Sequence, residues 1–474
     1  MIRDLKALAD REFDVLVIGG GIFGAGIARD AALRGLHVAL IDKADFASGT
    51  SSRSTKLIHG GFRYLEQGAF GLVAESCRER RTLQQLAPHL VRPQPFLFAV
   101  YEGDRRPLWQ MNLGMTLYDL LAAYRNPGRH QRYSVARTLE EEPRLNRHGL
   151  RGAVRFYDCA EDDARFCIDN VFHAAEMGAV CANYCELTAI TSAATQVTDR
   201  LTGATFVVRA RVYVNAAGPW VDRVAALAGP PVRLSPTKGV HLVLPRLTRQ
   251  HGVFFQSQRD GRIIFLVPWL DCSLLGSTDT DFAGDPATAA TEPADVEYLL
   301  RELRRIMPDA RVSESDIITT FAGVRPLLHS EGRPSARSRE ERIVWHRPNF
   351  VSVAGGKYTT YRAVAEKVVD RLSPARCRTA ITPLPQHCPP AAGEKVADVP
   401  EVHTSDIEHA CRQEMAVTLS DVMRRRTPLA LSRQGGRDVA ERVAGIMARE
   451  LGWSEEHARR QVEEYLTERK RGTL

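Results

Sequence analysis

The chain has 474 residues, enough for roughly two or three domains, and its composition, 44% hydrophobic and 26% charged, is that of a globular protein without a transmembrane helix. The formal net charge of +7 favours anionic partners, which include phosphorylated substrates, acidic lipids and nucleic acid. The 9 cysteines form no CxxC pair, so we expect neither a disulfide framework nor a zinc site, and we expect a reducing, cytoplasmic environment.

The N-terminal segment predicts a βαβ unit. Its charged start, MIRDLKALADREFDV, lacks the apolar stretch of a signal peptide. DVLVI then has the pattern of a buried strand, residues 22–33 that of a helix with small residues on its packing face, and HVALID that of a second buried strand. Gly19, Gly21 and Gly24 match the spacing GxGxxG between strand and helix, and Asp42 ends the second strand.

This pattern predicts a dinucleotide site. Gly19 permits a tight turn, Gly21 lets the backbone approach a pyrophosphate, and Gly24 lets helix and strand pack closely. The helix start at Ile22 offers N–H groups to an anion, and Asp42 can accept a hydrogen bond from a ribose hydroxyl, which disfavours NADP. The motif itself leaves NAD and FAD as alternatives. The chain has no second GxGxxG, which argues against an enzyme that uses both.

Strand patterns dominate the middle of the chain and helical patterns its end. After a helical pattern over residues 70–86, the strand-like segments are PQPFLFAVYE, GATFVVRARVYVNAAG, RIIFLVPW, CSLLGSTD and IVWHRPNFVSVAGG. Residues 374–400 are rich in Pro and Ala and predict a linker, while residues 404–474 are strongly helical. We therefore expect an α/β fold.

Several polar segments are candidates for a functional site. TSSRSTKLIHGGFRYLE, residues 50–66, collects hydroxyls and cations without a helical or strand period, and a solvated loop is the simple alternative. Arg325 in GVRPL is flanked by apolar residues, so it needs an anion or an oxygen-lined partner. From the residues alone, His241 in KGVHLVLP could be a core-edge histidine and Lys357 in AGGKYTT an exposed lysine.

Together, these segments resemble the FAD-dependent glycerol-3-phosphate dehydrogenases, flavoproteins that pass electrons to quinone. The matching segments are VIGGGIFGAGIARDAALRGL, TSSRSTKLIHGGFRYLE, EDDARF, VNAAGPWVD, TKGVHLVLP, FLVPW, GSTDTDFAGDP, FAGVRPL, VAGGKYTTYR and EMAVTLSDVMRRRT, in this order over most of the chain. The resemblance implies a Rossmann-like FAD-binding domain of the glutathione-reductase/D-amino-acid-oxidase type, an α+β substrate domain and a small helical C-terminal cap. We expect the FAD-binding domain over residues 10–80, 150–230 and 320–373, the substrate-binding domain over 81–149 and 231–319, a linker over 374–402 and the cap over 403–474.

The reaction implied by the resemblance is oxidation of sn-glycerol 3-phosphate to dihydroxyacetone phosphate by hydride transfer to FAD, with the electrons passed to a quinone. Arg63, Tyr64 and Lys357 match residues that hold the substrate phosphate, and His241 and Arg325 match residues beside the reacting carbon. Arg325 would stabilise negative charge on the C2 oxygen. His241 is the first candidate for the base and His59 the second.

The resemblance also implies a set of residues that bind FAD: Gly19, Gly21, Ile22, Gly24, Asp42, Lys43, Thr50, Ser51, Ser52, Lys56, His59, Gly60, Gly61, Ala217, Gly218, Gly323, Gly356, Lys357, Tyr358 and Thr359. Thr278 and Asp279 are expected to support the pocket, and Arg53 is expected at the surface. No metal ligands are expected.

The expected partners are glycerol 3-phosphate, a quinone and a second copy of the chain in a homodimer, with peripheral contact at the cytoplasmic face of the inner membrane and no nucleic acid. The basic run MRRRTPLAL is compatible with an anionic bilayer surface, and equally with a solvated helix end. The chain lacks a helical stretch that family members usually carry before EMAVTLSDVMRRRT, so we expect a shortened cap. The alternatives are a glycerol-3-phosphate oxidase that uses oxygen, an amino-acid-oxidising flavoprotein and a non-enzymatic flavin-binding protein.

Overall fold

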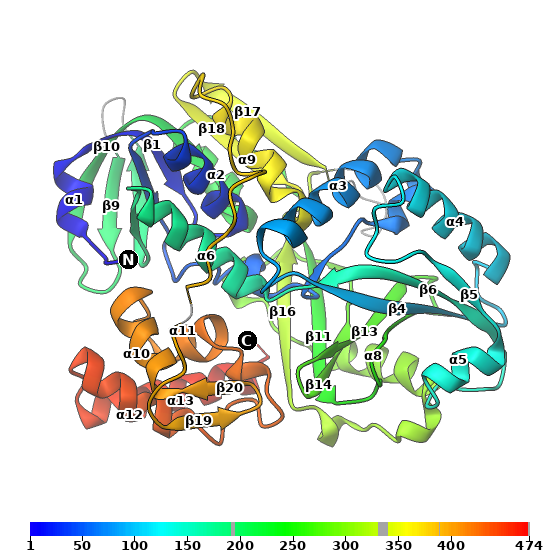
Figure 1. The fold of residues 1–474 in the computed structure, drawn as a ribbon. Helices are drawn as coiled ribbons and strands as arrows, with labels where there is room; N and C mark the ends of the chain where they lie inside the picture. Colours follow the sequence, from blue (N-terminus) through cyan, green and yellow to red (C-terminus); the bar gives the residue numbers. More distant parts are fainter. Residues whose placement is uncertain (191–194, 330–339, 388, 473–474) are drawn as a thin grey trace.

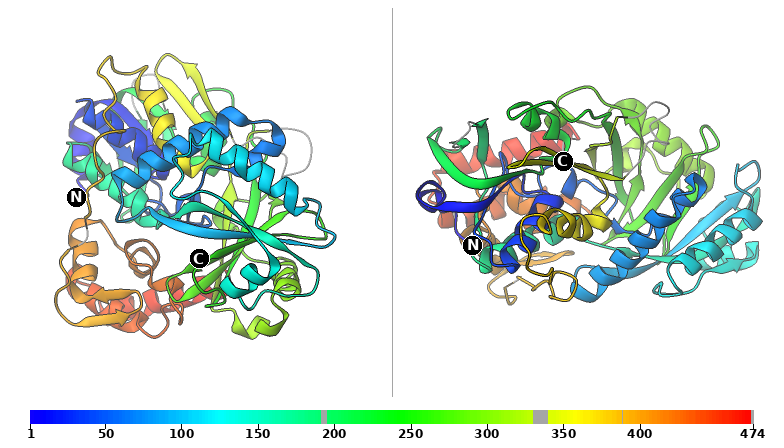
Figure 2. Two further views of the ribbon diagram at one scale, coloured as in Figure 1. Left: turned by 45° about the vertical axis from the view of Figure 1, so that its right-hand side comes forward. Right: turned by 90° about the horizontal axis from the view of Figure 1, so that it is seen from above.

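The protein is built from two β-sheets that stand side by side and a mostly helical C-terminal cap that lies below the first sheet and beside the second (Figure 1). The computed structural model describes residues 1–190, 195–329, 340–387 and 389–472. Two further views show an extended segment that runs along the outside of the molecule and joins the first-sheet region to the cap (Figure 2). This arrangement confirms the expected α/β fold with its helical cap.

The first sheet is 8-stranded and contains the predicted βαβ unit. Its strands are, in order, β17 (Glu341–Arg347), β18 (Phe350–Gly355), β10 (Thr205–Asn215), β1 (Glu12–Ile18), β2 (Val38–Ile41) and β7 (Val180–Ala182), with β8 (Cys185–Ile190) and β9 (Thr195–Asp199) attached beside β10. From β18 to β7 neighbouring strands run parallel. Parallel strands need cover on both faces. Val15 and Val17 of β1 accordingly pack in the cluster with the helices on one face, and Leu16 and Ile18 pack in the cluster on the other.

Among the described residues, five helices belong to this half of the molecule, and one of them, α2, connects the parallel strands β1 and β2. They are α1 (Leu5–Asp10), α2 (Ile22–Leu33), α6 (Asp163–Glu176), α7 (Val221–Ala226) and α9 (Tyr361–Val369). α2 packs against both α6 and α9, and a side chain at Gly26 of α2 would collide with the ring of Tyr361, its Cβ lying 2.5 Å from Cδ2. Small residues on α2 therefore allow the close helix contact that the sequence predicted.

The second sheet is 10-stranded and mostly antiparallel. Its strands are, in order, β15 (Thr280–Asp281), β11 (Thr237–Pro245), β14 (Cys272–Gly276), β13 (Ile263–Trp269), β12 (Gly252–Gln256), β4 (Arg92–Tyr101), β6 (Leu150–Ala160) and β3 (Leu57–Ile58), with β16 (Thr319–Arg325) paired to β11 and β5 (Gln131–Tyr133) to β6. Helices α3 (Phe70–Leu86) and α4 (Leu108–Leu121) cover one face, and α5 (Val135–Glu141) and α8 (Pro293–Ile306) cover the other. β3, β6 and all of β16 except Thr319 lie in ranges that we expected in the FAD-binding domain, so the chain crosses between the sheets at other positions than those boundaries imply.

The cap consists of helices α10 (Thr404–Gln413), α11 (Leu419–Asp421), α12 (Ala440–Leu451) and α13 (Glu455–Lys470), a π-helical turn (Val422–Arg426), and a hairpin of β19 (Lys395–Asp398) and β20 (Glu401–His403). The expected linker over 374–402 therefore ends in strand structure. Val443 and Met447 of α12 are fully buried within the apolar core that the cap shares with the second sheet. The cap is thus part of the globular body.

The basic run of the cap is turned inward. The side chains of Arg425 and Arg426 are only 6% and 1% exposed, because both enter ion pairs with Asp45 of the first-sheet region. These arginines are therefore not available to a bilayer surface, and the run does not support membrane contact. Within the described ranges no helix is both long and apolar enough to cross a membrane. The eight cysteines of those ranges are free thiols, and Cys388 lies outside them.

Candidate active site

A cavity of about 810 Å³ opens at the carboxyl ends of β1, β2 and β10 and extends to β11 and β16 of the second sheet. Open α/β sheets bind ligands at this end of their strands. Nineteen of the sequence-predicted site residues line it: Gly19, Gly21, Ile22, Asp42, Lys43, Thr50, Ser51, His59, Gly61, Arg63, Tyr64, Ala217, Gly218, His241, Gly323, Arg325, Gly356, Lys357 and Tyr358.

The glycine turn has no room for side chains. Gly19 has a φ of +107°, and a Cβ there would lie 2.6 Å from the carbonyl oxygen of Ala216 at the end of β10. A Cβ at Gly24 would lie 1.8 Å from the carbonyl oxygen of Gly19, so helix α2 approaches the turn as closely as backbone atoms allow. Gly21 precedes α2, and the N–H of Ile22 donates to Ser51 Oγ at 2.9 Å. The turn can therefore bring a ligand against backbone atoms.

The carboxylate of Asp42 lies beside this turn, just after β2. It accepts hydrogen bonds from the backbone N–H groups of Gly20 at 2.7 Å and Ala44 at 2.9 Å. Burial raises the pKa of Asp42 to about 6, although these two hydrogen bonds act in the opposite direction. Next to it, the ammonium of Lys43 lies 3.9 Å from the ring centroid of Trp220, so a cation and an indole flank the same end of the cavity. A carboxylate in this position fits a ribose hydroxyl.

The segment over residues 50–66 crosses from the glycine turn to the second sheet. Thr359 Oγ1 accepts from the N–H of His59 and donates to its carbonyl oxygen, both at 3.2 Å, which ties this segment to the turn after β18. The N–H of Gly60 donates to the hydroxyl of Tyr118 at 2.9 Å and to Asp158 Oδ1 at 3.1 Å. These contacts hold the backbone of the segment along the cavity wall.

Five predicted residues lie behind the cavity wall instead of lining it: Gly24, Ser52, Lys56, Gly60 and Thr359. Lys56 is buried, and its ammonium forms an ion pair with Asp163 at the start of α6. Its position therefore suits support of the segment over residues 50–66 more than direct contact with a ligand.

His241 lies on β11 at the junction of the two sheets. Its Nε2 is 2.9 Å from Thr55 Oγ1, its ring stacks on Phe321 with centroids 4.8 Å apart, and its Nδ1 is buried without a hydrogen-bond partner among the described residues. Burial, together with the positive charges of Arg325 and Lys56, lowers the pKa of His241 to about 3. The imidazole is therefore neutral at physiological pH.

Arg325 ends β16 and lies across β11. Its guanidinium donates to Asp279 Oδ1 at 3.1 Å and to Ser277 Oγ at 2.8 Å, which are the oxygen partners that its apolar sequence context predicted. A Cβ at Gly239 would lie 2.2 Å from Arg325 Nη2, so a side chain at this position would displace the guanidinium from where it crosses the strand. The support role expected for Asp279 agrees with this ion pair.

Two further cations, Lys357 and Arg63, line the cavity. The ammonium of Lys357 contacts Ser76 Oγ of α3 and lies 4.8 Å from the ring centroid of Tyr64. The guanidinium of Arg63 lies 5.6 Å from the ring centroid of Phe265 on β13. Arg63, Tyr64 and Lys357 all line the cavity, so it presents cations together with hydroxyl groups, the combination that binds phosphate.

Sequence reasoning misplaced Arg53 and missed Thr55. Arg53, which we expected at the surface, lines the cavity and donates to the carbonyl oxygen of Ala322 at 3.3 Å. Burial, with Arg424 and Arg425 nearby, lowers the pKa of Arg53 to about 9. Arg53 and Thr55 lie in a run of hydroxyls and cations that has neither a helical nor a strand period. The sequence therefore carried no signal for which of its side chains face the cavity.

Comparison with known proteins is consistent with a flavin site. A family model described as FAD dependent oxidoreductase matches residues 14–371, and one described as the C-terminal domain of alpha-glycerophosphate oxidase matches residues 360–458. The aerobic glycerol-3-phosphate dehydrogenase of Staphylococcus saprophyticus is 38% identical over 379 residues, which cover 78% of this chain and 68% of the relative. That of Staphylococcus aureus is 39% identical over the same length and coverage.

Solved structures extend the similarity to the whole chain. A glycerol-3-phosphate dehydrogenase from Bacillus halodurans, solved with FAD, has a TM-score of 0.78 and 27% identity, and the match covers 99% of this chain and 97% of that one. A glycine oxidase from Geobacillus kaustophilus has a TM-score of 0.61 at 22% identity, covering 80% of this chain and 100% of that one, and shares the fold alone. An L-alpha-glycerophosphate oxidase from Mycoplasma pneumoniae with FAD bound has the same TM-score at 20% identity, covering 76% of this chain and 95% of that one.

Proposed function

Because the chain belongs to the family of FAD-dependent oxidoreductases, together with the aerobic glycerol-3-phosphate dehydrogenases, we propose that it oxidises sn-glycerol 3-phosphate to dihydroxyacetone phosphate with FAD as its cofactor. The observation that carries the proposal is the content of one cavity. It joins the glycine turn and Asp42 at one end to Arg63, Lys357, Arg325 and a neutral His241 at the other. A dinucleotide flavin and a small phosphate ester together need this combination of groups.

The residues of the first sheet would hold FAD. Gly19 and Gly21 would bring the backbone against a pyrophosphate, and Asp42 would accept from a ribose hydroxyl. The segment over residues 50–61 lies along the cavity towards the second sheet. When bound, FAD supplies the acceptor for the two electrons that leave the substrate.

Arg63, Tyr64 and Lys357 would bind the substrate phosphate. Arg63 can offer two parallel N–H groups to phosphate oxygens, and Lys357 is a point charge held in place by Ser76 and by the ring of Tyr64. Fixing the phosphate fixes the position of C2 as well, and such orientation lowers a barrier by several kcal/mol. These three residues therefore act in binding and orientation.

His241 would take the proton of the C2 hydroxyl. Its pKa of about 3 keeps it neutral, and its side chain lines the cavity together with that of Arg325. Arg325 would stabilise the negative charge that develops on the C2 oxygen. His59 is the second candidate for the base.

For the later fate of the electrons, we propose a quinone as acceptor, reached by peripheral contact with an anionic membrane at the cytoplasmic face of the inner membrane, and a homodimer as the assembly. Support for these three points comes from the resemblance to quinone-linked dehydrogenases. Oxygen is the alternative acceptor, because the model matching residues 360–458 is described as the C-terminal domain of a glycerophosphate oxidase.

Anaerobic mixing of the FAD-loaded protein with glycerol 3-phosphate tests the proposal. The visible absorbance of the flavin should bleach within the dead time or within seconds, and glycerol and inorganic phosphate, added separately as controls, should leave it unchanged. Full flavin occupancy without bleaching would rule out the proposed substrate. Admitting air or a soluble quinone analogue to the reduced protein then separates the two acceptors, since rapid peroxide formation favours the oxidase.

A further inference from the structure

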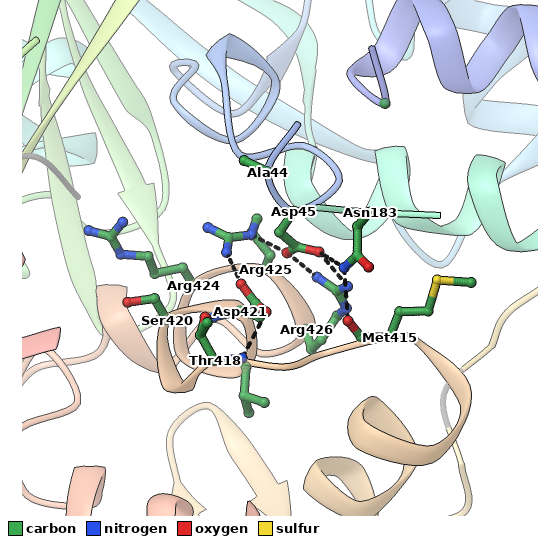
Figure 3. Close-up of polar contacts among 12 residues, drawn as sticks. Ala44, Asp45, Asn183, Met415, Thr418, Ser420, Asp421, Arg424, Arg425 and Arg426 are labelled. Atoms are coloured by element: carbon green, nitrogen blue, oxygen red, sulfur yellow. Dashed lines mark hydrogen bonds and ion pairs between the residues drawn. The ribbon is translucent and has the colours of Figure 1, made fainter. Parts of the chain in front are cut away.

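A buried cluster of charges joins the C-terminal cap to the turn that follows β2 (Figure 3). The carboxylate of Asp45 lies between the two guanidinium groups of Arg425 and Arg426. Arg426 binds both of its oxygens, at 2.5 and 2.8 Å, and Arg425 Nε donates to one of them at 2.5 Å. The amide of Asn183 donates to Asp45 Oδ1 at 2.9 Å from the other side.

The turn that carries Asp45 is the one that shapes the dinucleotide site. Three residues earlier, Asp42 accepts from the N–H of Gly20, in the glycine turn. Two residues later, the N–H of Ala47 donates to the carbonyl oxygen of the same Gly20 at 3.0 Å. Between them, the ring of Phe46 lies where a Cβ at Gly20 would approach to 2.4 Å. A shift of Asp45 would therefore move the groups that fix both Asp42 and Gly20.

The cap holds its two arginines with groups of its own. Arg425 Nη2 donates to Asp421 Oδ1 at 2.5 Å, and Arg426 Nη2 donates to the carbonyl oxygen of Glu414 at 2.6 Å. Asp421 is fixed in turn by the N–H groups of Val417 and Thr418, each at 2.9 Å. Contacts within the cap thus fix the geometry of the two guanidinium groups independently of the turn after β2.

The neighbouring arginine provides an internal comparison. Arg424 belongs to the same π-helical turn, but its guanidinium points away from Asp45 and lies 3.4 Å from Glu468 of α13 (Figure 3). Of the three consecutive arginines, Arg425 and Arg426 pair with Asp45, and Arg424 pairs with Glu468. A buried ion pair adds little net stability, because desolvation offsets its attraction, and its best-attested use is to fix one geometry.

We propose that Arg425 and Arg426 are positioning residues for FAD, acting through Asp45 to hold Asp42 and Gly20 in the arrangement that binds the ribose and pyrophosphate of the cofactor. Docking of the cap then sets the affinity for FAD, although the cap arginines do not line the cavity. Because the proposal concerns the cofactor alone, it holds or fails independently of the proposed substrate.

The test is FAD binding to the apo-protein, measured by quenching of flavin fluorescence at a temperature well below the unfolding midpoint of each apo variant. Arg426→Met should raise the Kd for FAD by about tenfold or more, the factor that corresponds to losing the positioning supplied by one charge-assisted hydrogen bond. Arg426→Lys keeps the charge without the fork and should give an intermediate Kd. Arg424→Met removes a guanidinium from the same turn and should leave the Kd within about twofold of the unchanged protein.

Asp45→Asn provides an independent variant, since it keeps the shape of the side chain and removes its charge. It should raise the Kd for FAD as Arg426→Met does. The proposal is overturned if folded Arg426→Met or Asp45→Asn binds FAD as tightly as the unchanged protein, or if Arg424→Met weakens binding equally. If Arg426→Met does not fold, Asp45→Asn and Arg426→Lys decide, and an unchanged Kd in both rejects the proposal.

Discussion

Replacing Arg325 by Met tests the chemistry of the site most directly. The change removes the positive charge beside the proposed C2 oxygen, and loss of one such preorganised donor typically lowers turnover by about 10² to 10³, or about 3–4 kcal/mol. The free energy of unfolding should change less than the activation barrier. Breaking a fully buried ion pair costs about 3–5 kcal/mol, but the Arg325 side chain is 19% exposed and its partner Asp279 is 7% exposed, so about 1–2 kcal/mol is expected.

The same substitution should change the pH dependence of the reaction. The charge of Arg325 acts with burial to lower the pKa of His241 to about 3, so its removal raises that pKa. The base is protonated and inactive below its pKa, and the acid limb of the pH–rate profile should therefore move to higher pH in Arg325→Met. Arg325→Lys keeps the charge and should leave the limb close to its original position.

The assay is the anaerobic rate of flavin bleaching by glycerol 3-phosphate, measured against pH, with thermal unfolding and visible absorbance as checks on folding and FAD content. Asp279→Asn is the control, because it removes the partner of Arg325 and leaves the charge in place, so its loss of rate should be smaller. A loss of less than about threefold in fully FAD-loaded Arg325→Met would place Arg325 outside the reaction.

Three further substitutions test the two ends of the cavity. Arg63→Met should raise the KM for glycerol 3-phosphate by about 10- to 100-fold, the effect of losing a charge-assisted contact to phosphate, while turnover at saturation changes little; an unchanged KM would remove Arg63 from phosphate binding. Gly24→Ala should abolish FAD binding or folding, because its Cβ would lie 1.8 Å from the carbonyl oxygen of Gly19. Gly445→Ala in α12 is the control, since its Cβ would meet nothing within 4 Å, and it should be tolerated. Thermal unfolding and flavin content measure both variants. Burial raises the pKa of Asp42 to about 6, so its carboxylate becomes protonated as the pH falls through that value and the Kd for FAD should rise. In a fluorescence titration, Asp42→Asn should bind FAD without this pH dependence.

The sequence predicted the parts of the fold that depend on neighbours in the chain. The helix expected over residues 22–33 and that expected over 70–86 have those bounds in the structure, because apolar period and glycine spacing are local signals. The glycine turn was predictable for the same reason. The residues expected around the substrate came from the resemblance, and the structure brings them to one cavity.

The features that the sequence did not predict depend on contacts between residues that lie far apart in the chain. β16 lies beside β11 in a register that sets Arg325 opposite Thr237, and this register puts the guanidinium over Gly239. Nothing in either segment alone specifies that pairing. Arg425 and Arg426 were assigned to a basic surface because their acidic partner Asp45 is about 380 residues away in the chain. A charged run is buried or exposed according to its partners, which composition does not show.

The contact between Asp45 and Arg426, separated by 381 positions, also has a consequence for the order of events during synthesis. Domains begin to fold as they leave the ribosome, so the βαβ unit is complete long before the cap exists. If the cap arginines set the turn after β2, a nascent chain holds an unfinished cofactor site until translation has passed residue 426. Flavin would then be captured late, and chains interrupted before the cap would hold it more weakly.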